Sequence, residues 1–133
     1  MLRKIRENAV IFLFGGVLYS MIEICFRGHT HWSMTLTGGM CLVIMYRHFE
    51  AYPLESMLAK CLFGAMVITA LEFAVGCVVN LMLGWNVWDY SSRPFNIMGQ
   101  VCLLFSAMWF LLSVPAVYLC RVFKNKFSRA DGV

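Results

Sequence analysis

The chain has few charged residues and no long polar segment. Only 14% of its 133 residues are charged, whereas soluble domains carry about 25%. Hydrophobic residues make up 61% of the composition. This balance excludes an ordinary soluble domain and predicts an integral membrane protein, with residues 1–133 forming a single transmembrane domain.

Motifs of the common enzyme classes are also absent. The sequence has no Walker A loop, no G-x-S-x-G elbow, no H-E-x-x-H helix and no dinucleotide fingerprint. A transporter driven by ATP would therefore need a separate ATPase chain. The cysteines stand singly, without a C-x-x-C pair, which predicts neither disulfides nor a zinc site; they are Cys25, Cys41, Cys61, Cys77, Cys102 and Cys120. We expect no metal and no cofactor.

Four apolar runs are candidates for membrane spans, since a span needs about 20 apolar residues. They cover residues 9–26, 33–49, 57–83 and 99–123. The fold class predicted is an all-α integral membrane protein built as a bundle of four transmembrane helices. The polar tail 125–133 is expected to fray.

The basic residues predict the orientation. Nine of the 11 Lys and Arg residues fall on the side of the two termini, and only Arg27 and Arg93 fall on the other side. Because cytoplasmic loops are enriched in Lys and Arg, both termini are predicted on the cytoplasmic side of the membrane. The net charge of +4 is explained in this way, and we expect no nucleic-acid partner.

The connection before the last span is unusual. Its sequence, GWNVWDYSSRPFNIM at 84–98, combines rings that suit the membrane interface with isolated polar groups. We expect it to fold back over the outer end of the bundle as a lid or a short interfacial helix.

Two carboxylates lie inside the apolar runs, Glu23 in the first and Glu72 in the third. A charge in hydrocarbon costs several kcal/mol, so such residues usually face a bundle interior or a wet cavity. Glu23 and Arg27 are four residues apart, in the order that favours an ion pair. The helical rise places Glu72 near the bilayer midplane. We predict a polar cavity, open to the outside, that holds both carboxylates.

Small and hydroxyl residues accompany the carboxylates on each helix, among them Ser20, Thr35, Thr69 and Ser106. Helix packing explains these positions best, because small residues allow close approach and hydroxyls bond across the contact. For Glu72, two structural alternatives to a functional role stay open. It could form an ion pair with Arg27 or Arg93, or stay protonated by burial. The predicted binding set is Glu23, Arg27, Trp32, Glu72, Asn80, Trp88, Asp89, Tyr90, Arg93 and Asn96.

Four segments together resemble a known family. They are GGVLYSMIEICFRG at 15–28, HWSMTLTGG at 31–39, LEF at 71–73 and WDYSSRPFNIMGQVCLLFS at 88–106. They resemble the small bacterial membrane proteins of the ABC-transporter type IV (CmpB-like) family. The resemblance implies a multi-span protein of the bacterial cytoplasmic membrane that serves as a permease component. The matching positions are Glu23, Arg27, Gly28, Trp32, Glu72, Trp88, Asp89, Tyr90, Arg93, Pro94, Phe95, Asn96 and Gly99.

Three functional hypotheses follow. The first is a transport component in contact with membrane lipid, working as a homo-oligomer or with a partner membrane subunit, because one four-span chain is too small to form a pathway. The second is a membrane enzyme acting on a lipid or amphiphile, with a carboxylate as acid or base and Arg27 and Arg93 holding an anionic group. The third is a regulatory or assembly subunit of a larger complex.

Overall fold

A computed structural model describes residues 1–130, and helices occupy each of the four apolar runs. The helix α1 covers Leu2–Arg27, α2 covers Trp32–Ala51, α3 covers Met57–Gly76 and α4 covers Leu103–Ala130. A π-helical segment, η1, continues α3 over Cys77–Met82. Residues 125–130 belong to α4, and the rest of the predicted frayed tail lies outside the described residues.

The helix ends follow from local sequence. α1 stops at Gly28, whose φ of 80° is left-handed and whose N–H donates to Ile24 O at 2.8 Å; glycine adopts this conformation without strain. α3 begins after Ser56, whose hydroxyl accepts the N–H of Ala59 at 3.2 Å, as N-cap serines do. These caps fix the two tight turns between α1, α2 and α3.

The segment between η1 and α4, called here the outer segment (residues 84–102), contains no helix. Two short strands, β1 (Asn96–Ile97) and β2 (Val101–Cys102), pair antiparallel within it, with Asn96 opposite Cys102. The last apolar run therefore begins in a hairpin, and its helix starts only at Leu103. Of the two predicted forms, a lid or a short interfacial helix, the helix does not form, because the segment folds into turns and this hairpin.

Three helical stretches are long and apolar enough to cross a membrane, namely Leu2–Arg27, Met57–Met82 and Leu103–Ala130. α2 is not among them, because polar residues at both of its ends lower its mean hydropathy. The chain is thus an all-helical membrane protein, as predicted. Membrane crossing by α2, which would complete the four-span bundle, stays a prediction.

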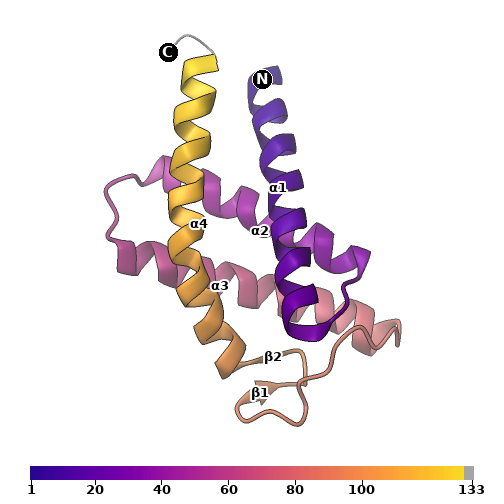
Figure 1. Cartoon of the computed structure of the whole chain (residues 1–133). Helices are drawn as coiled ribbons and strands as arrows, with labels where there is room; N and C mark the ends of the chain where they lie inside the picture. The colour runs from indigo at the N-terminus through magenta and orange to yellow at the C-terminus, as the bar shows by residue number, and fades with distance from the viewer. Residues whose placement is uncertain (131–133) are drawn as a thin grey trace.

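The helices form two crossed layers. In Figure 1, α1 and α4 make the nearer layer, and α2 and α3 run across behind them. α1 packs closely on α2 because Gly38 leaves room for Tyr19; a Cβ at Gly38 would overlap the Tyr19 side chain. Hydroxyl pairs also bridge helix contacts. Ser20 of α1 bonds Thr35 of α2 at 2.7 Å, and Thr69 of α3 bonds Ser106 of α4 at 2.8 Å. These polar positions therefore serve helix packing.

Candidate functional site

Glu72 is buried at the meeting point of three helices. It comes from α3 with only 2% of its surface exposed, and it accepts a hydrogen bond from the Tyr19 hydroxyl on α1. The Tyr19 ring stacks on Trp109 of α4, with centroids 5.2 Å apart and planes 15° from parallel. Glu72 thus faces the bundle interior, which is what a carboxylate at membrane depth requires.

A second carboxylate, Glu23, lies on α1 one helical turn after Tyr19. Glu23 is 4% exposed and pairs with Arg27, with 2.9 Å between Oε2 and Nε. Arg27 also donates to the Tyr90 hydroxyl of the outer segment. Its guanidinium lies over the rings of Trp88, 5.6 Å from the centroid, and Tyr90, 5.0 Å away. Arg27 therefore joins α1 to the outer segment.

Glu72, Tyr19, Glu23 and Arg27 form one unit, called here the acidic cluster. The two carboxylates are close enough to interact electrostatically, and both interact with Arg27. In the described part of the chain, no second Lys or Arg forms an ion pair with either carboxylate. Two acidic side chains with one guanidinium leave one carboxyl group without a basic partner in a buried place. Such a group needs a proton or a cation as its partner, so the cluster has the chemistry to hold either.

A buried N–H group of the cluster lacks a hydrogen-bond partner. Arg27 Nη1 is shielded from solvent and makes no hydrogen bond within residues 1–130. Buried donors are usually paired, so this group is available to an acceptor atom of a bound molecule or to water. The indole of Trp109 lies next to the Glu72 carboxyl group. Trp109 was not predicted as a site residue, since nothing in its local sequence distinguishes it from a core tryptophan.

The outer segment covers the end of the acidic cluster at Arg27 with two buried rings. Trp88 and Tyr90 are each 6% exposed. The Trp88 indole donates to Gln100 O at 2.9 Å, and the Tyr90 ring stacks on Phe105 with centroids 4.9 Å apart. Burial raises the pKa of the Tyr90 hydroxyl above its usual range, although Arg27 opposes the shift. Tyr90 therefore stays a neutral phenol next to the guanidinium.

Asn80 anchors the outer segment from η1. Its Oδ1 accepts the N–H of Val87 at 2.6 Å, and its Nδ2 donates to Gln100 Oε1 at 2.8 Å. The Asn80 side chain thus binds both the start and the end of the outer segment. Gly76 makes this fit possible, because a Cβ there would lie 2.6 Å from Gln100 Oε1. η1 ends the helical stretch that begins with α3, and Asn80 lies within it, directly before the outer segment.

The remaining predicted residues do not reach the carboxylates. Asp89 is exposed and accepts the N–H of Ser91 at 2.9 Å, and hydrogen bonds from Ser91 lower the pKa of Asp89. Arg93 is exposed, 5.3 Å from the Phe105 ring centroid, and Asn96 donates to Arg93 O at 2.7 Å. Trp32 is 59% exposed and packs edge-on against Trp85. The expected ring of Arg27, Asp89 and Arg93 around a cavity mouth does not form. Arg27 turns inward, Asp89 bonds within its own loop, and Arg93 lies over Phe105 of α4.

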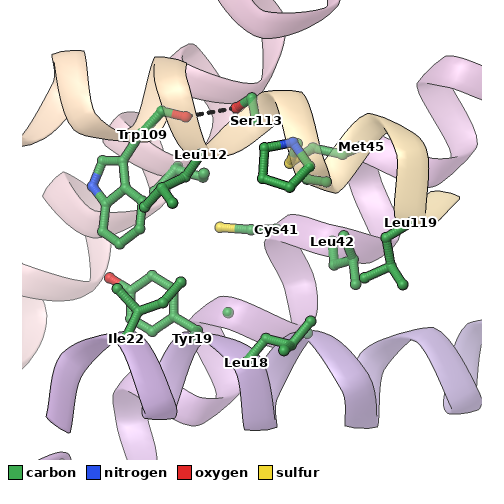
Figure 2. A pocket seen from close by; sticks show the side chains of 15 residues that line it. Leu18, Tyr19, Ile22, Cys41, Leu42, Met45, Trp109, Leu112, Ser113 and Leu119 are labelled. Carbon is green, nitrogen blue, oxygen red and sulfur yellow. Dashed lines mark hydrogen bonds between the residues drawn. The ribbon is translucent and has the colours of Figure 1, made fainter. Parts of the chain in front are cut away.

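The principal hollow next to the cluster is apolar. A cleft of about 220 Å³ lies between α1 and α4, with Cys41, Leu42 and Met45 of α2 along its floor. Figure 2 shows the Tyr19–Trp109 pair at one end of it, and Ser113 turned to the carbonyl of Trp109. Neither Glu23 nor Glu72 lines this cleft. The described residues therefore contain a hydrophobic cleft that ends at the partner of Glu72, where a polar cavity was expected.

Sequence reasoning left out Tyr19 and Gln100 as site residues. Tyr19 lies four residues before Glu23, on the same helix face, so its position on the carboxylate face was visible. Gln100 is a polar residue in an apolar run and is 3% exposed. Such a residue is a candidate anchor, because a buried amide needs hydrogen-bond partners.

The fold and the site together define a helical membrane protein that carries a buried acidic cluster under a folded outer segment. A family model described as "Putative ABC-transporter type IV" matches residues 10–130, and the chain belongs to this family. The resemblance predicted from the four segments is thereby confirmed. No solved structure matches the chain.

Proposed function

We propose that this protein is a permease-type subunit of a membrane transporter, and that its acidic cluster takes up a proton or a small cation beneath the outer segment. The observation that carries the proposal is the charge balance of the cluster. The cluster holds two buried carboxyl groups, Glu23 and Glu72, and one guanidinium, Arg27, which pairs with Glu23. In membrane proteins such ionisable residues commonly mark ion pathways and proton relays.

The outer segment is the proposed gate. Arg27 touches the cluster through Glu23 and the outer segment through Tyr90. Uptake of a cation next to the carboxylates weakens the attraction between Glu23 and Arg27, because the added positive charge competes for the same oxygens. Release of Arg27 would loosen Tyr90 and open the outer side. Protonation and access are coupled in this way through one side chain.

The geometry gives less support to an enzyme of the kind outlined above. That alternative needs Arg27 and Arg93 to hold an anionic group beside a carboxylate, and Arg93 instead lies exposed over Phe105. A subunit role within a larger assembly fits the chain better. We propose that copies of this chain or partner membrane subunits complete the pathway, and that a separate ATPase supplies energy where ATP is used.

Proton movement in proteoliposomes tests the proposal. The full chain is reconstituted with an entrapped pH-sensitive dye, and a valinomycin-driven potassium potential is imposed. We expect proton movement above that of protein-free liposomes, and a loss of about tenfold or more for Glu72→Gln. The matched control is Glu7→Gln. Glu7 is another buried carboxylate, but it lies on α1 at the opposite end of the bundle, where it pairs with Arg3 and Arg47. Equal rates for wild type and Glu72→Gln would reject the proposal.

A further inference from the structure

A pocket lined partly by charged side chains lies at the opposite end of the bundle from the acidic cluster. It is a pocket of about 110 Å³ between the end of α2, the start of α3 and the C-terminal half of α4. Three cationic side chains line it, Lys60, Arg121 and Lys124, together with Glu50. Neither the proposed transport cycle nor the family description uses this pocket.

Lys60 is the unusual member. Only 4% of its surface is exposed. Its ammonium group donates one hydrogen bond, to Pro53 O at 3.4 Å, and lies 6.0 Å from the centroid of the Phe49 ring. No carboxylate within residues 1–130 forms an ion pair with it. Lys60 also lies in the first turn of α3, where the helix dipole disfavours a cation. A buried ammonium in this position is costly unless an anion joins it.

Glu50 does not supply that anion. Its carboxylate pairs with Arg47, with 2.7 Å between Oε2 and Nη1. The other two cations, Arg121 and Lys124, lie three residues apart on one side of α4. The pocket therefore combines three cations with one carboxylate that is already neutralised. The net positive charge and the size of the pocket suit a small oxyanion.

We propose that this pocket binds a phosphate group, with Lys60 as the buried contact and Arg121 and Lys124 as the outer ones. The predicted orientation places the pocket at the cytoplasmic side, where basic pockets between membrane helices bind phospholipid headgroups. The phosphate comes either from an anionic phospholipid of the inner leaflet or from a soluble phosphate ester. Both sources offer the same oxygens to the same three side chains.

Lipid binding to the purified full chain tests this site. Native mass spectrometry measures the affinity for phosphatidylglycerol and for phosphatidylcholine with identical acyl chains, in mixed micelles. The variant Lys60→Met removes the charge and keeps the volume, while Lys60→Arg keeps the charge. Lys126→Gln is the matched control, because Lys126 is an exposed cation of α4 that does not line the pocket. Inorganic phosphate and glycerol phosphate are added as soluble competitors.

We expect the wild type, Lys60→Arg and Lys126→Gln to bind phosphatidylglycerol about tenfold more tightly than phosphatidylcholine. Lys60→Met should lose this preference, because a hydrogen bond to a charged group contributes about tenfold in affinity. Displacement of the lipid by glycerol phosphate assigns a soluble ester as the source, and retention of the lipid assigns the headgroup. If Lys60→Met fails to fold, the surface double variant Arg121→Gln with Lys124→Gln gives the same comparison. An unchanged preference in the folded variant, or no preference and no phosphate binding in the wild type, overturns the proposal.

Discussion

The phenol of Tyr19 on α1 donates a hydrogen bond to the carboxylate of Glu72 on α3. The residues are 53 positions apart in the chain, so this bond ties the first and third helices together at the depth of the acidic cluster. The same ring stacks on Trp109 and forms one end of the apolar cleft. A change at Tyr19 therefore affects the bundle and the site together.

Replacing Tyr19 with phenylalanine is expected to destabilise the protein by about 1–3 kcal/mol, because a buried carboxylate then lacks its donor. The ring and its stacking on Trp109 are kept, so the loss reports the hydroxyl alone. Unfolding by denaturing detergent, followed by circular dichroism, measures the effect. Tyr118→Phe is the control, since Tyr118 is 53% exposed. Equal stability of the two variants would mean that the Tyr19 hydroxyl contributes nothing.

Carbodiimide labelling is expected to report a proton held by the cluster. Dicyclohexylcarbodiimide reacts with protonated carboxyl groups in apolar surroundings, and the apolar cleft reaches Tyr19 and Trp109. We expect a label on Glu72 that Glu72→Gln abolishes while the protein stays folded, since the amide keeps the shape of the protonated carboxyl group and carries no charge. Peptide mass spectrometry locates the label. Labelling of the exposed Glu50 with Glu72 unmodified would contradict this expectation.

Breaking the Glu23–Arg27 pair on one side is expected to cost up to about 3 kcal/mol, because the remaining charge stays buried. Arg27→Gln alone and Glu23→Gln alone should each destabilise the protein, and the double variant should be less destabilised than the sum of the two. A double-mutant cycle measures this coupling. Strict additivity would show that the two side chains act independently.

Loss of the Asn80 anchor is expected to free the outer segment without unfolding the helices. Asn80→Ala removes the acceptor of Val87 N and the donor to Gln100. Cys102, only 2% exposed on β2, should then react with a maleimide about tenfold faster, since local opening loses roughly one buried hydrogen bond. Site-resolved mass spectrometry follows the reaction, with Cys120 on α4 as the internal reference.

A matched variant separates this effect from a general loss of stability. Asn8 accepts a hydrogen bond from Arg47 at 2.9 Å near the other end of the bundle. Asn8→Ala removes a comparable side-chain contact, and Cys102 should keep its slow reaction there. Faster labelling of Cys102 in both variants would show that Asn80 has no special hold on the outer segment.

The sequence predicted the helices and the acidic face of α1 correctly. Apolar run length sets where helices form in a membrane, and the four-residue spacing alone places Arg27 beside Glu23. The outer segment was also expected to fold back, from its rings and its isolated polar groups. Its hairpin was missed because two-residue strands leave no periodic pattern in a sequence.

The sequence by itself determined what lies on one face of one helix, because helical periodicity fixes those neighbours. Contacts between helices were decided only by the tertiary structure, since the crossing of the two layers sets which faces meet. In the tertiary structure Arg27 faces the acidic cluster and Arg93 is exposed, and Tyr19 meets Glu72. The same packing made the cleft between α1 and α4 apolar and enclosed Lys60 in a basic pocket. Each of these outcomes depends on the register between helices, which close packing of whole side chains selects and spacing along a single helix does not.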